Sequence, residues 1–330
     1  MSVLILTEKE LKNIVKIDIP AIDAIEQAFA WLSQGKVSMP PIMHIEVPEY
    51  EGDVDIKSAY VKGLERFAVK IGAGFFNNAA LGLPSSPAMM VVISAKTGMA
   101  EAVLLDNAYL TDVRTAAAGA VAARHLAPET VSCAGVVGAG AQGRYQLMAL
   151  AQVRPFDRAL VYDRDDDLAA RYALTMTEKL GRPVEVAADV NDLVARSQSV
   201  VTCTPSKIPY VDPDALHPGL HITAMGADLP EKQELMPKVF ERSDIIACDV
   251  RSQSFSAGEL YNAIKAGVDI TASQVAELGE IITGKAQGRQ DQEQITVCDL
   301  SGTGVQDTAI AAFALSRAAG KDMGTAIRTD

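Results

Sequence analysis

The chain has 330 residues, of which 48% are hydrophobic and 22% are charged, and its formal net charge at pH 7 is −12. This length and composition predict a globular protein of two domains, because a single core rarely serves so long a chain. The negative charge argues against nucleic acid and an anionic membrane surface as partners, although a local basic pocket could still hold a small anion.

The first third of the sequence predicts an α+β domain. A capping box at Thr7 and Glu10 starts a short helix after the apolar run VLIL, and a second helix follows Pro20. From about 37 to 105, segments such as RFAVKIG and AEAVLLD alternate or run apolar and are separated by turn residues. This pattern favours an antiparallel sheet.

The remainder of the chain alternates between strands and helices. An alanine-rich helix begins near 111 and ends at Pro128. Short apolar strands then alternate with helices as far as the strand QITVCDL, which leads into a last helix. Such alternation predicts a parallel sheet with helices on both faces.

Two expectations concern the setting of the protein. No run approaches the roughly 18 apolar residues of a membrane span, and the apolar stretch in MSVLILTEKE is too short for a secretory signal. The cysteines lack paired spacing and lie in or beside strand-like runs: Cys133, Cys203, Cys248 and Cys298. This pattern indicates reduced core cysteines rather than a zinc site or disulfides. We therefore expect a cytoplasmic protein that binds neither metal nor membrane.

The run CAGVVGAGAQGR contains three spaced glycines, Gly138, Gly140 and Gly143, between an apolar strand and a helix. A second strand ends at Asp163, 20 positions after Gly143. This spacing is typical of a dinucleotide-binding turn, in which the backbone approaches the pyrophosphate and the carboxylate binds the ribose hydroxyls. The alternative is a strand–helix turn without a ligand. Asp163 favours NAD, whereas the adjacent Arg164 leaves NADP open.

Three charged residues occupy unusual places in the pattern. Lys70 interrupts the strand RFAVKIGAGFF and faces either solvent or a ligand. Arg114 is predicted in the first turn of a helix beginning near Thr111, where the helix dipole disfavours a cation; this indicates a nearby anion or a local partner such as Asp112. Asp228 follows a parallel strand at the edge where ligands bind in open α/β sheets, or it caps a turn.

A second glycine-bearing turn, SGTGVQD, precedes the last helix. It is either a plain loop in which Asp307 caps that helix, or a segment that closes over the cofactor. The residues alone leave both interpretations open.

These features, in this order, resemble the ornithine cyclodeaminase/μ-crystallin family along essentially the whole chain. The matching stretches are FAVKIG, GLPSSPAMMV, LTDVRTAAAGAVAARHLA, VVGAGAQGR, VYDRD, ITAMGADLPEKQEL and SGTGVQD. The resemblance implies an α/β protein in which a Rossmann-type parallel-sheet domain, 119–304, is inserted into a discontinuous α+β domain, 1–118 and 305–330. The discontinuous domain would bind the substrate and form a homodimer.

The resemblance also implies roles for particular residues. Lys70 matches the family's active-site lysine, Asp228 its catalytic aspartate, and Arg114 the arginine that binds the substrate carboxylate. The matches to the family's NAD contacts are Gly138, Gly140, Gln142 and Asp163, and Ser85 falls where a hydroxyl residue touches the nicotinamide side. We also expect cofactor contacts from neighbouring positions in these motifs: Ala141, Arg164, Thr204, Gly302 and Thr303.

Two departures from the family pattern bear on the substrate. Cyclodeaminases have a further arginine near the segment MPPIMH, where this chain offers His44. They also have a carboxylate about thirteen residues before the lysine, where this chain has Lys57. A lysine would repel the distal amine of ornithine but would attract a second carboxylate. An alignment slip of two would instead place Asp55 there and restore an amine-binding site.

Within the family, the stretch MPPIMHIEVPEYEGDVDIKSAYVKGL looks most like the ectoine-utilisation branch and is similar to iminosuccinate reductases. We therefore predict an NAD(P)H-dependent reductase of a small, dicarboxylic α-imino acid, with iminosuccinate to L-aspartate, as in ectoine degradation, as the preferred case. The alternatives are an ornithine cyclodeaminase that uses bound NAD⁺, an alanine dehydrogenase or ketimine reductase, and a μ-crystallin-like binding protein.

Overall fold

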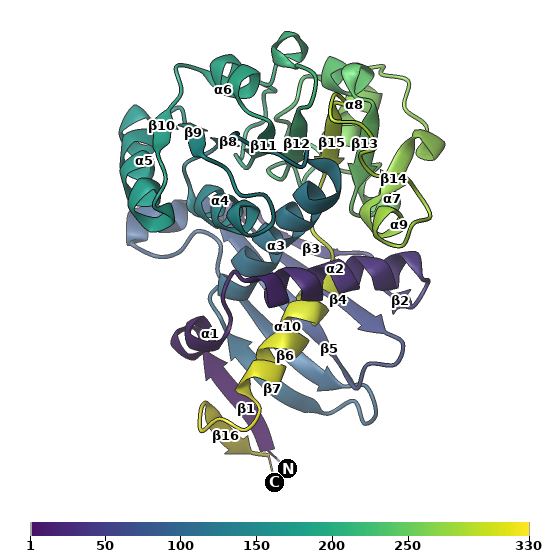
Figure 1. Cartoon of the computed structure of the whole chain (residues 1–330). Coiled ribbons are helices and arrows are strands. Elements are labelled where there is room, and N and C mark those ends of the chain that lie inside the picture. Colours follow the sequence, from purple (N-terminus) through teal and green to yellow (C-terminus); the bar gives the residue numbers. More distant parts are fainter. Residues whose placement is uncertain (1, 330) are drawn as a thin grey trace. The chain divides into compact units, whose positions relative to one another are not determined.

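The computed structural model describes residues 2–329, without the side chains of Phe76 and Ala79, and contains two compact units (Figure 1). The terminal unit consists of Met1–Lys16, Asp23–Arg114 and Thr303–Asp330, and the inserted unit consists of Ile17–Ile22 and Thr115–Gly302. The sequence-based divisions after 118 and before 305 differ from these limits by a few residues. In addition, residues 17–22 group with the inserted unit rather than with the N-terminal segment.

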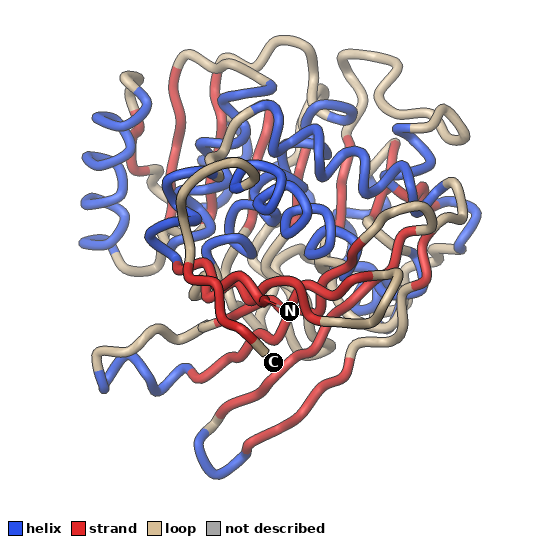
Figure 2. The backbone as a smooth tube through the Cα atoms, turned by 90° about the horizontal axis from the view of Figure 1, so that it is seen from below, coloured by secondary structure: helices blue, strands red, loops and turns tan. Residues whose placement is uncertain are grey.

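The terminal unit contains a mostly antiparallel sheet with the strand order β16-β1-β7-β6-β5-β4-β2, and β3 also pairs with β4. Of these pairs, only β1 and β7 run parallel. The first and last strands of the chain pair, which brings the two chain ends together (Figure 2). The strands are β1 (Ser2–Thr7), β2 (Val37–Ser38), β3 (Met43–Val47), β4 (Gly52–Val61), β5 (Arg66–Phe75), β6 (Ala88–Ser94), β7 (Ala100–Leu105) and β16 (Thr325–Arg328).

The predicted last helix is confirmed as α10 (Gly304–Ala318), which packs on β4 and β5 of the terminal sheet (Figure 1). The hydroxyl of Thr308 donates to the carbonyl oxygen of Ala59 at 2.7 Å and accepts from the N–H of Ala68 at 3.0 Å. The start of the helix can approach β4 because residue 304 is glycine: a Cβ there would lie 2.4 Å from the carbonyl oxygen of Ser58. The other helices and turns that include residues of this unit are α1 (Glu8–Ile14), α2 (Ile19–Ser33), η1 (Pro48–Tyr50), η2 (Phe76–Leu81) and α3 (Tyr109–Leu126).

The inserted unit contains the predicted parallel sheet, with the strand order β10-β9-β8-β11-β12-β15-β13-β14 and every pair parallel. Its strands are β8 (Cys133–Val137), β9 (Arg158–Tyr162), β10 (Val184–Val186), β11 (Ser199–Thr202), β12 (His221–Ala224), β13 (Ile245–Cys248), β14 (Val275–Glu277) and β15 (Thr296–Asp299). Its remaining helices and turns are α4 (Ala141–Val153), α5 (Asp166–Leu180), α6 (Val190–Arg196), η3 (Pro213–Ala215), η4 (Pro237–Arg242), α7 (Arg251–Ser254), α8 (Glu259–Lys265), η5 (Ala272–Gln274) and α9 (Leu278–Ile282).

The parallel sheet is buried on both faces. Along β8, Cys133 and Val137 belong to one hydrophobic cluster, whereas Ala134 and Val136 belong to another on the opposite face. This alternation follows from the two-residue period of a strand. It confirms the expectation of a sheet covered on both sides, as parallel sheets require.

The cysteines are all free, and three of the four are buried; Cys203 is half-buried. Within residues 2–329, no helix combines the length and the apolar character that a membrane span requires.

Candidate functional site

Two buried lysines lie side by side on the terminal sheet. In the antiparallel pairing of β4 and β5, Lys57 stands directly opposite Lys70, so both side chains emerge from the same face. Lys57 is 8% exposed and Lys70 is 5% exposed. The alternative of a solvated Lys70 is therefore wrong. Like charges placed opposite each other are unfavourable, and burial adds to this cost, so the pair needs nearby negative charge.

Arg114 reaches the same place from α3, with negative charge supplied by Asp307 of α10. The Nε atom of Arg114 lies 3.0 Å from Oδ1 of Asp307, and Nζ of Lys70 lies 3.6 Å from Oδ2. A guanidinium nitrogen of Arg114, Nη1, also donates to the amide oxygen of Gln306 at 2.9 Å. All three charged side chains are buried. The structure thus brings Lys70 and Arg114 together at one buried carboxylate, with Lys57 directly opposite Lys70 on the sheet.

Two interpretations of this region were wrong. The helix that carries Arg114 begins at Tyr109, not near Thr111, so Arg114 lies in the second turn and the helix-dipole argument does not apply to it. The helix starts earlier in the chain than expected because the carboxylate of Asp106 accepts a hydrogen bond from the N–H of Leu110 at 2.9 Å. Asp307 does not cap α10, because the N-cap is Thr303.

Burial lowers the pKa of the Lys70 ammonium to about 8. Asp307 opposes this shift, whereas the positive charges of Arg114 and Lys57 add to it. Burial also raises the pKa of the nearby Asp106 carboxyl to about 7. A lysine pKa lowered this far by burial and neighbouring charges is typical of functional lysines.

Asp55 and Lys57 occupy the same face of β4, because they are two residues apart. Asp55 is already engaged: its Oδ1 lies 2.8 Å from Nδ1 of His44, which stands opposite it on β3. The hydrogen bond to the Asp55 carboxylate raises the pKa of His44. Asp55 stands opposite Gly72, two residues along the strands from the Lys57–Lys70 pair. The residue beside Lys70 is thus Lys57, and His44 lies next along the same face.

The glycine turn of the inserted unit has the geometry of a dinucleotide site. Gly138 has φ of +110°, a conformation that favours glycine, and a Cβ on Gly143 would lie 2.1 Å from the carbonyl oxygen of Gly138. By contrast, a Cβ on Gly140 would meet no atom within 4 Å. Gly140 is also the N-cap of α4, where no side chain caps the helix. Its Cβ position is thus open beside an uncapped helix start, as a pyrophosphate requires.

Asp163 lies at the end of β9, against this turn. Its Oδ2 accepts from the N–H of Ala139 at 2.8 Å, and its Oδ1 accepts from the N–H of Asp165 at 3.0 Å. Asp163 is half-buried and Arg164 is exposed. A carboxylate fixed beside the glycines fits the ribose hydroxyls of NAD. The other predicted contacts at the turn, Ala141 and Gln142, form the first residues of α4.

We expect opposite behaviour from Gly140 and Gly143, the second and third glycines of the turn. Gly143→Ala should lower the free energy of unfolding by about 2–4 kcal/mol, because its Cβ would collide with backbone. Gly140→Ala should leave the thermal midpoint within about 2 °C of wild type but should weaken NADH binding, measured by fluorescence titration. Equal thermal midpoints for both variants would contradict the tight packing at Gly143.

Asp228 lies in the loop after β12, at the carboxyl edge of the parallel sheet. The carboxylate is exposed, and its Oδ1 accepts from Nζ of Lys232 at 2.7 Å. The predicted cofactor contact Thr204 follows β11 at the same edge. Both loops therefore occupy the position where open α/β sheets bind ligands.

Glu234 connects these two loops, and sequence reasoning missed it. One oxygen, Oε1, accepts from the N–H of Thr204 at 2.6 Å and from the hydroxyl of Tyr210 at 2.7 Å. The other, Oε2, accepts from the N–H of Gly226 at 2.9 Å and the hydroxyl of Thr202 at 2.7 Å. Glu234 is fully buried. A glutamate in the polar segment LPEKQEL gives no sequence signal of such partners.

The remaining predicted contacts lie in other segments. Ser85 belongs to the terminal unit, where its carbonyl oxygen accepts from the N–H of Phe75 at 2.8 Å. The N–H of Gly302 donates to Asp249 at 2.7 Å, within the inserted unit. Thr303 is buried at the start of α10. Their roles as cofactor contacts remain predictions.

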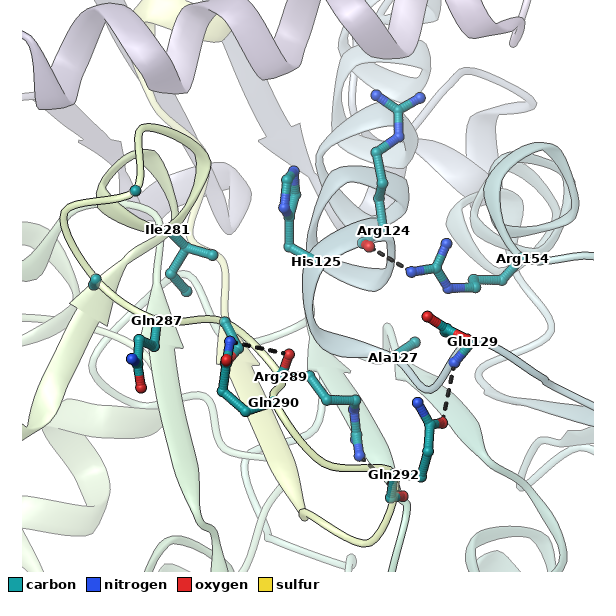
Figure 3. Close-up of a pocket in the computed structure, with 13 residues that line it drawn as sticks. Arg124, His125, Ala127, Glu129, Arg154, Ile281, Gln287, Arg289, Gln290 and Gln292 are labelled. Atoms are coloured by element: carbon teal, nitrogen blue, oxygen red, sulfur yellow. Dashed lines mark hydrogen bonds between the residues drawn. The ribbon is translucent and has the colours of Figure 1, made fainter.

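A cavity of about 500 Å³ in the inserted unit is lined by basic residues (Figure 3). Two of its three arginines are engaged by backbone: Arg154 donates to the carbonyl oxygens of Arg124 and Pro128, and Arg289 donates to those of Leu126 and Leu220. These bonds satisfy carbonyls at the end of α3 and at the amino edge of the sheet. These arginines therefore have a structural role. The cavity lies at the amino edge of the parallel sheet, whereas the glycine turn lies at its carboxyl edge.

The fold and the glycine turn define a Rossmann-type α/β protein with a second, discontinuous α+β unit. The chain belongs to the ornithine cyclodeaminase/mu-crystallin family, which it matches over residues 1–322. A protein of Rhizobium meliloti named provisionally as a dehydrogenase is 47% identical over 321 residues, or 97% of each chain.

Two solved structures have the same fold. The iminosuccinate reductase of Paracoccus denitrificans, in complex with NAD⁺, superimposes with a TM-score of 0.92 at 30% identity, covering 99% of this chain and 100% of that one. An archaeal alanine dehydrogenase dimer with bound NAD has the same TM-score at 33% identity and full coverage of both chains. Relatives are thus NAD-dependent oxidoreductases or cyclodeaminases, and the family alone leaves the reaction open.

Proposed function

We propose that this protein is an NAD(P)H-dependent imine reductase, with iminosuccinate to L-aspartate as its preferred reaction. The observation that carries the proposal is the buried pair of Lys57 and Lys70, joined by Arg114. Lys70 and Arg114 share one buried carboxylate, Asp307, and Lys57 lies opposite Lys70. Three cations with one carboxylate leave positive charge to attract the two carboxylates of a dicarboxylic substrate. A cyclodeaminase would instead need a carboxylate for a distal amine, and the candidate, Asp55, is bound to His44.

Bound NADH, whose pyrophosphate and ribose fit the glycine turn and Asp163, supplies the hydride. Arg114 and Lys70 hold the α-carboxylate of the substrate. Lys57, with His44, binds the distal carboxylate. Asp228 orients the imine nitrogen and relays a proton from solvent to it, directly or through a water molecule. The C=N double bond would thereby become a single bond, with the hydride forming a new C–H bond and the proton a new N–H bond.

The assay follows NADH absorbance with oxaloacetate plus ammonium, which form iminosuccinate in solution. Pyruvate plus ammonium and L-ornithine are the parallel substrates, and NADPH replaces NADH in a second series. We expect rapid NADH oxidation with oxaloacetate and ammonium, at least about 10-fold faster than with pyruvate. Release of ammonia and proline from ornithine without change in NADH would identify a cyclodeaminase and contradict the proposal.

We also propose that the protein works as a homodimer. The terminal unit exposes large apolar side chains on β3 and in the segments that follow it: Met43, Ile45, Tyr50, Leu81 and Leu83. Such exposure favours a protein partner. The alanine dehydrogenase relative is a dimer.

Production of aspartate by such an enzyme would also match the ectoine-degrading role that the sequence resemblance suggests.

A further inference from the structure

The start of α10 is fastened to β4 and β5 immediately beside the paired lysines. Thr308 bonds to Ala59 and Ala68, the neighbours two residues from Lys57 and Lys70 on the same face. Gly304 packs against the backbone of Ser58. The backbone of Asp307 lies between these two fixed points. The backbone of Asp307 is therefore held in place beside the paired lysines.

Asp307 is fully buried, and neither of its carboxylate oxygens has a hydrogen-bond partner among the described residues. Among the residues that the structure describes, its ion-pair partners are Lys70 and Arg114. Burying a carboxylate without hydrogen bonds is energetically costly, so the ionised form of Asp307 depends on its ion pairs with these two cations. Gln306 holds a second edge of the Arg114 guanidinium through Nη1.

We propose that Asp307 is a positioning residue: its carboxylate fixes the ammonium of Lys70 and the guanidinium of Arg114 for binding of the substrate carboxylate. This inference rests on the proposed function, in which Lys70 and Arg114 bind that carboxylate. With Nε held by Asp307 and Nη1 by Gln306, the remaining nitrogen of Arg114, Nη2, is presented to the substrate. A fixed guanidinium binds a carboxylate more strongly than a mobile one.

Asp307 should also extend the pH range in which Lys70 is charged. The charged groups around Lys70 are Lys57 and Asp55 of β4, Arg114 of α3, Asp307 of α10, and Asp106 before α3. On β6, the residue opposite Lys70 is the apolar Met90. Of these groups, Asp307 opposes most strongly the lowering of the Lys70 pKa by burial.

The test compares Asp307→Asn with wild type in two measurements. The first is NMR titration of lysine labelled with ¹³C at Cε, in which the Lys70 signal is identified by its loss in Lys70→Arg. We expect the titration midpoint of Lys70 to fall by about 1–2 pH units. The second measurement is kcat/KM as a function of pH. The pH at which kcat/KM declines on the alkaline side should fall by the same amount as the Lys70 midpoint. KM for the imino acid should rise about 10-fold, with a smaller change in kcat. The matched control is Asp106→Asn, a buried aspartate whose amide still accepts the Leu110 N–H; it should shift the Lys70 midpoint much less.

An unchanged Lys70 midpoint in Asp307→Asn would overturn the inference. Because the NMR titration needs no substrate, that outcome is distinct from failure of the proposed function, in which no imino acid is reduced by wild type. If Asp307→Asn does not fold, as judged by circular dichroism, Asp307→Glu keeps the charge but moves it by one methylene. The Glu variant should titrate near wild type at Lys70 and still show a raised KM; a wild-type KM would contradict the positioning role.

Discussion

Replacement of Asp228 by asparagine should lower kcat by about 10²–10⁴-fold, while the affinity for NADH stays within about 2-fold of wild type. The amide keeps the size of the side chain and can still accept from Lys232, but it cannot give a proton to the imine nitrogen. Because the loop is held by Glu234 at Gly226, we expect its backbone to stay in place. Turnover is measured by NADH oxidation, and NADH affinity by fluorescence titration.

The matched control for this experiment is Asp269→Asn, which removes an exposed carboxylate elsewhere in the inserted unit. It should leave both kcat and NADH affinity unchanged. Wild-type turnover in Asp228→Asn would refute the proton role. Equal losses of turnover and NADH affinity would instead indicate that the loop, rather than the proton, was disturbed.

Replacement of Lys57 by methionine should raise KM for iminosuccinate by about 30–1000-fold, equivalent to about 2–4 kcal/mol for a lost buried charge pair. The methionine keeps most of the apolar stem and removes only the charge. KM for iminopyruvate, which lacks the distal carboxylate, should change far less. The stability of the protein should not fall, because Lys57 and Lys70 are like charges in direct opposition on the sheet.

Lys62→Met serves as the control, since this exposed lysine follows the end of β4 in the same hairpin. It should change KM for neither substrate. Equal losses on iminosuccinate and iminopyruvate in Lys57→Met would contradict the dicarboxylate assignment. Ornithine turnover gained by the variant would point to an amine-binding site formed with Asp55.

The sequence by itself determined the architecture of the inserted unit and the place of its glycine turn. Short apolar strands alternating with helices permit little except a parallel sheet covered on both faces, because each element has one face to bury. The glycines at 138 and 143 are local requirements: one needs a positive φ, and the other leaves no room for a Cβ. Such requirements depend on neighbours in sequence and can be predicted from it.

Only the tertiary structure decided which charges meet. Arg114 and its partner Asp307 lie far apart in the chain, and they meet because α10 returns to the terminal sheet. The register of β4 and β5 puts Lys57 opposite Lys70, and one β3–β4 pair binds Asp55 to His44. Sequence gives the period of a strand but not its partner or register, because these are set by packing of distant segments. Glu234 could not be predicted for the same reason: its partners are brought to it only when its loop folds over the edge of the sheet.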